Sequence, residues 1–337
     1  MKFSCVATQR FDIFTSYYKR TMMNIKALIL LCTLFAGVLC ACKKSDMDEK
    51  LAEEKQKLAE DLTTTFGEAA IPLGGGAYLV KTHEEPEGAI IEAGNYILWN
   101  REITNYITGD LEYTSEKSSI KFPDSYVDGG PEITLVQSEF PIDEGLKKMS
   151  KGEKGDIYIP SCWLYYDFQP RIYSVEIVNV IRDLTVYQEA LMYGYLKRLH
   201  RGTRVDTIPN VVSTIDKDET GYNVMYHILD QGTGEDITKN RNIETTTSIS
   251  YMIRENNVRS YKVDQDQIWY THSGQRNTLT KTNCVGEILE KMKKGGKVVV
   301  TMPSKLYWED DNLPRNEYYD QYYIPKWSVV IFTITVK

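Results

Sequence analysis

The stretch that decides the fold of this chain is "ILEKMKKGGKVVVTMPS", Ile288–Ser304, which reads as a short helix, a glycine turn and a strand. An earlier stretch, "GLKKMSKGEKGDIYIPS", Gly145–Ser161, has the same order of residue types. Aligned without gaps, the two stretches share Leu, Lys, Met, Lys, Gly, Lys, Pro and Ser, which are eight matches in seventeen positions. Because this helix–turn–strand unit occurs twice, 143 positions apart, we predict one domain present in two copies.

Short β-rich runs surround both copies. The first copy follows "AYLVKT", "NYILWN", "IKF" and "EITLVQ" and precedes "IYSVEIVNVI"; the second is flanked by "NVMYHILD", "TTTSISYMI" and "SVVIFTITV". β-branched and aromatic residues between Gly, Pro and Asp turns are typical of strands. Helices are predicted over 143–149 and 285–292, closed by Gly152 and by Gly295-Gly296. Each half is therefore predicted to be β-rich with one small helix packed on a sheet.

The connection between the halves is predicted to be a helix. "LTVYQEALMYGYLKRL", Leu184–Leu199, has helical apolar spacing, and a strand-poor stretch then leads to Gly221. The predicted organisation is a signal segment at 1–42, a charged helical stalk at 43–69, a first domain at 70–183, a helical linker at 184–221 and a second domain at 222–337. A chain of 337 residues has room for two such domains.

Charge and composition exclude several kinds of site. From position 43 onward, 35 Lys or Arg face 46 Asp or Glu, a net charge of −11, which argues against nucleic-acid binding. The four histidines are scattered, and no Cys/His spacing fits a metal, so neither metal nor cofactor is predicted. Cys162 and Cys284 are expected to be ordinary buried or half-buried thiols.

The N-terminus resembles the signal segment of a bacterial lipoprotein. "ALILLCTLFAGVLCA", residues 27–41, is too short for a comfortable membrane span and suits a signal-peptide core. It ends in "LCAC", which resembles a lipobox, so Cys42 is the predicted acylated (palmitate-bearing) residue and mature N-terminus. Translation would start naturally at Met22 or Met23. The alternatives are an ordinary signal peptide or a short anchor helix. The predicted location is the bacterial cell envelope, on the periplasmic or surface face of the outer membrane.

The repeated unit and its neighbours resemble the FKBP-type peptidyl-prolyl cis-trans isomerase family. In the second copy the resemblance is carried by Leu289, Met292, Gly295, Lys297, Pro303, Ser304, Tyr307, Ile324, Pro325, Val330 and Phe332. It covers residues 222–337, and more weakly 75–181. The implied fold class is α+β: two FKBP-like domains, each a twisted antiparallel β-sheet wrapped around a short helix, joined by a helical linker.

The resemblance also implies an activity and a site. The family rotates the peptide bond before proline, whose barrier is about 18–20 kcal/mol, without breaking a bond and without a cofactor. Such a site needs an apolar, aromatic cup for the proline ring. The residues carried over as catalytic are Tyr251, Tyr261, Tyr307 and Phe332, and those carried over as substrate-binding are Val285, Trp269, Trp308 and Ile324.

The second domain departs from the family pattern at three positions in and beside this site. Val285 stands where the family has the tryptophan at the floor of the pocket, and Lys262 stands where it has an aspartate. Trp308 replaces the glycine after the loop tyrosine, and either Trp269 or Trp308 could refill the floor.

The first domain departs much further. Its equivalent positions hold Arg101, Leu111, Glu112, Ile142, Leu164 and Ile177, so every aromatic residue of the pocket is replaced. We interpret this domain as a structural or binding copy.

Two functions follow as hypotheses. The first is an FKBP-type isomerase or isomerase-like folding chaperone of the cell envelope, acting through the second domain on proline-containing polypeptides. The alternative is a non-catalytic binding or structural lipoprotein whose degenerate domains bind an envelope protein partner. Both place the chain on a membrane through a lipid on Cys42.

Overall fold

The computed structural model describes residues 46–115, 132–137, 140–164, 166–199, 204–213, 220–239, 241–270, 280, 282–307, 324 and 327–337, and of residues 261–263 and 270 it describes the backbone alone. The apolar run 27–41, Cys42, Trp308 and the run "IKF" at 120–122 lie outside these residues. The chain divides into two compact units. One contains Pro160–Pro170 together with the N-terminal part up to Ala70, and the other contains the remainder.

The predicted stalk forms a helix over residues 46–66. Its Leu58 and Leu62 are buried, so the helix is not surrounded by water on all sides. Glu54 binds the loop within the same unit: the backbone N–H of Ser161 donates to Glu54 Oε1 at 2.7 Å, and Ser161 Oγ donates to Glu54 Oε2 at 2.5 Å. Within the described part of the chain, no helix combines the length and the apolar character that crossing a membrane requires.

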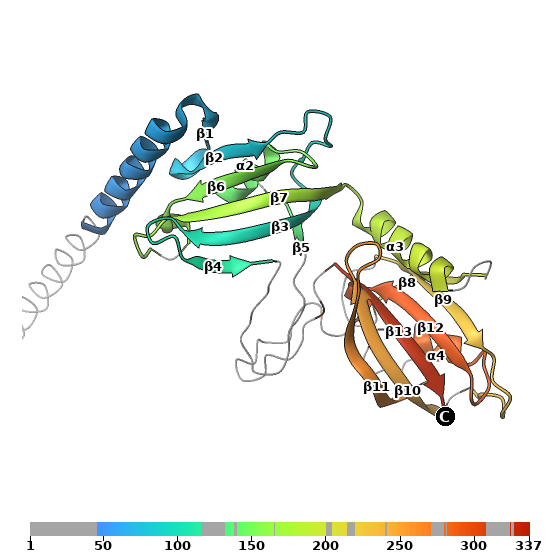
Figure 1. Ribbon diagram of the computed structural model, residues 1–337. Coiled ribbons are helices and arrows are strands. Elements are labelled where there is room, and N and C mark those ends of the chain that lie inside the picture. The colour runs from blue at the N-terminus through green and yellow to red at the C-terminus, as the bar shows by residue number, and fades with distance from the viewer. Residues whose placement is uncertain are drawn as a thin grey trace, which may run out of the picture. The chain divides into compact units, whose positions relative to one another are not determined.

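The first sheet is antiparallel and is built from strands β1–β7 (Figure 1). The strands are β1 (Ala70–Pro72), β2 (Tyr78–His83), β3 (Tyr96–Asn105), β4 (Leu111–Thr114), β5 (Glu132–Leu135), β6 (Lys154–Ile159) and β7 (Arg171–Ile181). Their order is β1-β2-β6-β7-β3-β4, and β5 pairs with β3. The short helix α2 (Pro141–Lys147) precedes β6 and packs its buried Leu146 into the core.

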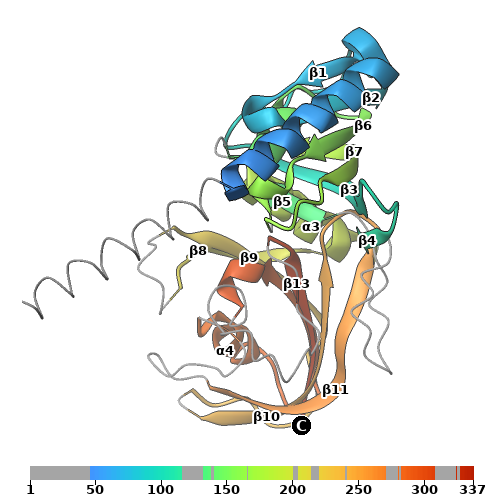
Figure 2. The same cartoon turned by 90° about the vertical axis from the view of Figure 1, so that its left-hand side faces the viewer.

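The second sheet is also antiparallel and curves around a short helix, α4 (Cys284–Leu289), as Figure 2 shows. Its strands are β8 (Asp206–Val211), β9 (Tyr222–Asp230), β10 (Asn242–Met252), β11 (Val258–Tyr270), β12 (Lys297–Pro303) and β13 (Val329–Val336). Their order is β11-β10-β13-β12-β9-β8.

The two sheets have the same strand order. The correspondence pairs β2 with β9, β3 with β10, β4 with β11, β6 with β12 and β7 with β13. The short helix comes directly before β6 in the first sheet and before β12 in the second. The predicted fold class, α+β with two antiparallel sheets each holding a short helix, is therefore confirmed.

Both short helices end earlier than predicted. α2 ends at Lys147 and α4 at Leu289, because the next N–H groups donate three residues back: Met149 to Leu146 at 2.9 Å and Met292 to Leu289 at 3.0 Å. Gly152 and Gly295 lie in the turns beyond, with φ of 92° and 80°. They therefore turn the chain into the next strand and do not cap the helices.

The connecting segment contains more structure than predicted. The helix α3 (Leu184–Leu199) forms where the apolar spacing placed it. The following stretch contains strand β8, which pairs with β9 and so extends the second sheet, contrary to the expectation of a strand-poor stretch. The expectation was wrong because "DTIPNV" contains a proline and an asparagine, which lower strand propensity, and only the edge position allows them.

Helix α3 packs on one face of the second sheet. Its Leu191, Met192 and Leu196 form a buried cluster with Met225, Met252, Val299, Val329 and Ile331. Gln188 Nε2 donates to the carbonyl oxygens of Trp327 at 2.8 Å and Ser328 at 3.0 Å. The opposite face of the sheet is therefore the one that meets α4 and carries the candidate site.

Candidate active site

The pairing of the central strands places two of the predicted catalytic side chains on the α4 side of the sheet. Phe332 of β13 lies opposite Ile249 of β10 and Val300 of β12. Tyr251 of β10 lies opposite Val330. Because residues directly opposite in an antiparallel ladder point to the same face, and i and i+2 do so along a strand, these side chains gather in one apolar layer.

The other predicted residues join the same layer from different elements. Val285 comes from α4, Trp269 from the end of β11, and Tyr307 follows the 3-10 turn Ser304–Leu306 that leads out of β12. Six predicted site residues thus belong to one buried cluster: Tyr251, Trp269, Val285, Tyr307, Ile324 and Phe332. The segments are far apart in sequence, and only the fold brings them together.

Phe332 is at the centre of the aromatic packing. Trp269 meets it edge-on, with ring centroids 5.6 Å apart and an interplanar angle of 89°. Tyr307 packs on it at 6.0 Å and 48°. Edge-to-face pairs at this spacing contribute about 0.5–1.5 kcal/mol beyond the area they bury. Trp269 therefore lies in the same cluster as Val285, the residue that replaces the expected tryptophan.

Two threonines that sequence reasoning missed hold this tryptophan. Trp269 Nε1 donates to Thr247 Oγ1 at 3.3 Å, and Thr247 Oγ1 lies 3.0 Å from Thr245 Oγ1. Both threonines are buried. Their i, i+2 spacing on β10 was the available signal, because it places them on the face that Tyr251 shares.

The six clustered side chains are between 0 and 7% exposed. They therefore form a packed aromatic layer that shows little surface to solvent. Burial also raises the pKa of the neighbouring Cys284 thiol to about 12, so this thiol stays neutral and is not a nucleophile at physiological pH.

Two predicted site residues, Tyr261 and Trp308, remain. Tyr261 falls where the pairing of β10 and β11 is irregular, between the pairs Ile249–Lys262 and Ser250–Ser260. The side chains of Tyr261 and Lys262 lie outside the described atoms, as does the whole of Trp308. Among the described residues, no group of three His, Cys, Asp or Glu side chains could hold a metal ion.

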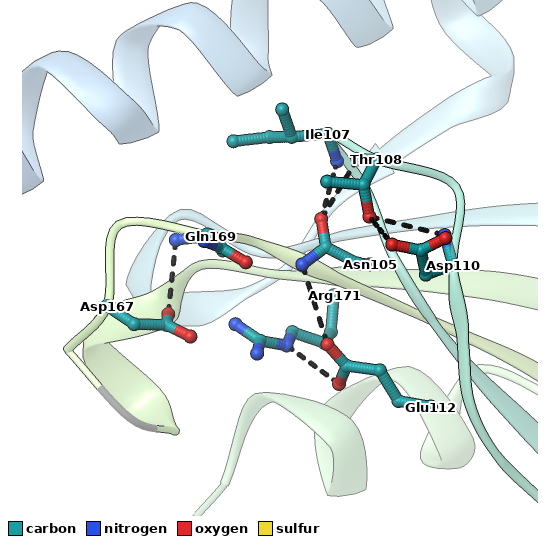
Figure 3. Close-up of polar contacts among 8 residues, drawn as sticks. All are labelled: Asn105, Ile107, Thr108, Asp110, Glu112, Asp167, Gln169 and Arg171. Carbon is teal, nitrogen blue, oxygen red and sulfur yellow. Dashed lines mark hydrogen bonds and ion pairs between the residues drawn. The ribbon is translucent and has the colours of Figure 1, made fainter.

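In the first domain, the residue at the family's aspartate position forms an ion pair. Glu112 of β4 accepts from Arg171 Nε at 3.0 Å and from Asn105 Nδ2 at 3.5 Å (Figure 3). Asn105 Oδ1 in turn accepts the N–H groups of Ile107 at 2.9 Å and Thr108 at 3.1 Å, which fixes the β3–β4 turn. This carboxylate therefore holds a hairpin to β7 and is not part of an apolar cup.

Arg101, which stands at the strand-tyrosine position of the first domain, also forms an ion pair. Arg101 Nε lies 3.1 Å from Glu132 Oε2, and its guanidinium lies over the Trp99 and Tyr113 rings. Ile177, which stands for the last-strand phenylalanine, is buried, and it is aliphatic where the second sheet has the aromatic ring of Phe332.

The fold and site therefore define a tandem α+β protein with one aromatic-lined copy and one charged copy. No family model matches the chain, and no curated protein matches its sequence.

Three solved structures with which the chain shares similarity can be compared with it. A peptidyl-prolyl cis-trans isomerase from Pseudomonas syringae is 16% identical, over 40% of this chain and 95% of its own, with a TM-score of 0.31. FkpA from Escherichia coli is 16% identical, over 45% of this chain and 59% of its own, with a TM-score of 0.28. The structure of the three FKBP domains of wheat FKBP73 is 12% identical, over 78% of this chain and 94% of its own, with a TM-score of 0.25. At such values the fold assignment rests on the strand order above.

Proposed function

We propose that this chain is an FKBP-type peptidyl-prolyl isomerase, or an isomerase-like folding chaperone, that acts through its second domain. The observation that carries the proposal is the convergence of Tyr251, Trp269, Tyr307 and Phe332 on one face of the second sheet. An aromatic, dry layer is what a proline ring needs, and no acid, base or metal is required for the rotation.

The test is acceleration of prolyl isomerisation in a short peptide by residues 43–337, which include every described residue. Tyr251→Phe and Tyr307→Phe keep the rings and remove the hydroxyl donors, so we expect kcat/KM to fall several-fold, as for the loss of one or two hydrogen bonds. Tyr193→Phe is the matched control, because Tyr193 lies exposed on α3. Absence of acceleration by the wild type, or equal loss in the control, would contradict the catalytic proposal.

The second candidate function is non-catalytic polypeptide binding. The specific observation in its favour is the 0–7% exposure of the six clustered side chains, together with the charged first domain. On this proposal the wild type and both tyrosine variants suppress aggregation of a proline-free unfolded client equally well, and none accelerates isomerisation. Loss of client protection in the tyrosine variants would contradict it.

We also propose that a lipid on Cys42 anchors the chain in a bacterial cell envelope. The supporting observation is the "LCAC" sequence after the apolar run. Growth with a palmitate analogue is expected to label the wild type and Cys162→Ala, the matched control, but not Cys42→Ala. Equal labelling of Cys42→Ala would contradict the assignment.

A further inference from the structure

Arg101 occupies, in the first domain, the place that Tyr251 occupies in the second. It lies on β3 opposite Val175 of β7. Its side chain shares a face of the sheet with Trp99, two residues before, and with Ile103, two residues after. Ile103 pairs with Tyr173, and Tyr173 pairs with Ile157, whose side chain lies against α2. Arg101 therefore points to the side of the sheet that carries the candidate site in the second domain.

Two aromatic rings and one carboxylate hold the guanidinium of Arg101. Its central carbon lies 5.3 Å from the centroid of Trp99 and 4.8 Å from that of Tyr113. Glu132 Oε2 accepts from Nε at 3.1 Å, and the Tyr113 hydroxyl donates to Glu132 Oε1. Trp99 is itself fixed, since its Nε1 donates to Thr134 Oγ1 at 3.1 Å. The guanidinium is thus oriented before any ligand arrives, which reduces the entropy lost on binding.

The outer edge of this guanidinium has no partner in the described part of the chain. The only side-chain hydrogen bond there is the one from Nε, and the backbone N–H of Arg101 donates to Ser115 Oγ at 2.9 Å. The side chain is 28% exposed. Among the described residues the two Nη groups are therefore left without a hydrogen-bond acceptor, and a planar guanidinium can bind a carboxylate through two parallel hydrogen bonds.

The local charge favours a monoanion over a phosphate. Glu132 already places its carboxylate beside Arg101; burial raises the pKa of Glu132 above its ordinary value, and Arg101 offsets only part of that rise. An incoming carboxylate brings one charge to this pair, whereas a phosphate group brings about −1.5 to −2 and meets more repulsion from Glu132. The Trp99 and Tyr113 rings beside the guanidinium also suit the apolar atoms of a polypeptide.

We propose that the first domain binds a polypeptide carboxylate, from an acidic side chain or a chain terminus, on the open fork of Arg101. In this role the pocket position of the first copy recognises a charged group where the second copy presents an aromatic layer. The two copies then bind chemically different parts of a polypeptide. This site does not depend on isomerase activity in the second domain.

The test measures fluorescence anisotropy of labelled Ala/Gly hexapeptides with residues 43–337. One peptide carries a free C-terminus, one an amidated C-terminus and an internal Glu, and one an amidated C-terminus with no acid. We expect one or both carboxylate peptides to bind and the neutral one to bind at least about tenfold more weakly, as for charge-assisted hydrogen bonds. Which of the two binds identifies the source of the carboxylate.

Two substitutions test the role of the fork. Arg101→Lys keeps the charge but removes the fork, and Arg101→Gln removes both; each is expected to weaken carboxylate binding about tenfold or more. Lys154→Gln is the matched control, because Lys154 is an exposed cation of the same sheet that pairs with Glu176. Circular dichroism of each variant confirms folding. Equal binding of all three peptides, unchanged binding by both Arg101 variants, or tighter binding of a phosphoserine peptide would overturn the proposal.

Discussion

The two copies differ at one pair of equivalent core positions. Gly145 and Ile288 occupy the same position in the two short helices, and Ile157 and Val300 occupy the same position in the strands that follow. A Cβ on Gly145 would lie 2.8 Å from Ile157 Cδ1. The first copy therefore combines glycine on the helix with isoleucine on the strand. The second combines isoleucine on the helix with the slightly smaller valine on the strand, so it holds more side-chain volume at this pair of positions.

Burial of one thiol predicts a pH dependence of stability. The pKa of Cys284 rises from 9.0 to about 12 in the folded chain. Between pH 9 and pH 12 the thiol of the unfolded chain loses its proton while the thiol of the folded chain keeps it. The free energy of unfolding is therefore unaffected by this thiol below about pH 9 and falls as the pH rises above it. The expected slope is about 1.4 kcal/mol per pH unit.

The measurement is urea unfolding of the wild type and Cys284→Ala from pH 8 to 10.5. The tyrosines whose pKa burial also raises, Tyr158, Tyr187 and Tyr195, are present in both proteins and cancel in the comparison. The wild type is expected to lose stability more steeply above pH 9. Parallel curves would show that the thiol ionises freely in the folded state.

At the scale of elements, α3 is a structural part of the second domain. The alternation of β12 and β13 gives the second sheet two apolar faces, one toward α4 and one toward α3. Strands buried on both faces read as continuous hydrophobic runs, as "KVVVTMP" and "VVIFTITV" do. Without α3, the face formed by Val299, Val329 and Ile331 would be open to water.

Adjacent residues of α3 are predicted to differ sharply in their effect on stability. Met192 is fully buried against the sheet, whereas Tyr193 is 50% exposed. Met192→Ala is expected to lower the free energy of unfolding by about 2–5 kcal/mol. Tyr193→Ala, the control, should cost no more than about 1 kcal/mol, since it loses only an exposed contact with Lys197. Equal costs in thermal or urea unfolding would mean that α3 does not pack as described.

At the scale of the whole molecule, each sheet closes a core around its own short helix. Ile177 and Phe332 are equivalent residues of β7 and β13, and both are fully buried. Chains with more than one domain often depart from a single two-state transition. We therefore expect two unfolding transitions by calorimetry.

Substitution of each equivalent residue should move one transition only. Phe332→Ala is expected to destabilise the second domain by about 3–5 kcal/mol, and Ile177→Ala the first by about 2–5 kcal/mol. A single transition that both substitutions shift equally would show that the two cores unfold as one.

The repeated helix–turn–strand unit, the strand runs and the helix at 184–199 followed from local patterns, because apolar periodicity and turn residues are properties of short segments. The predicted site residues of the second domain came from the resemblance to the FKBP-type family, and the fold brings six of them together. Sequence could not show that Trp269 packs on Phe332 and bonds Thr247, that Val285 is buried beside them, or that β8 extends the sheet. Nor could it show that Trp99, Tyr113 and Glu132 enclose Arg101. Those contacts join strands that are distant along the chain, and only the register of the antiparallel ladders decides which side chains meet.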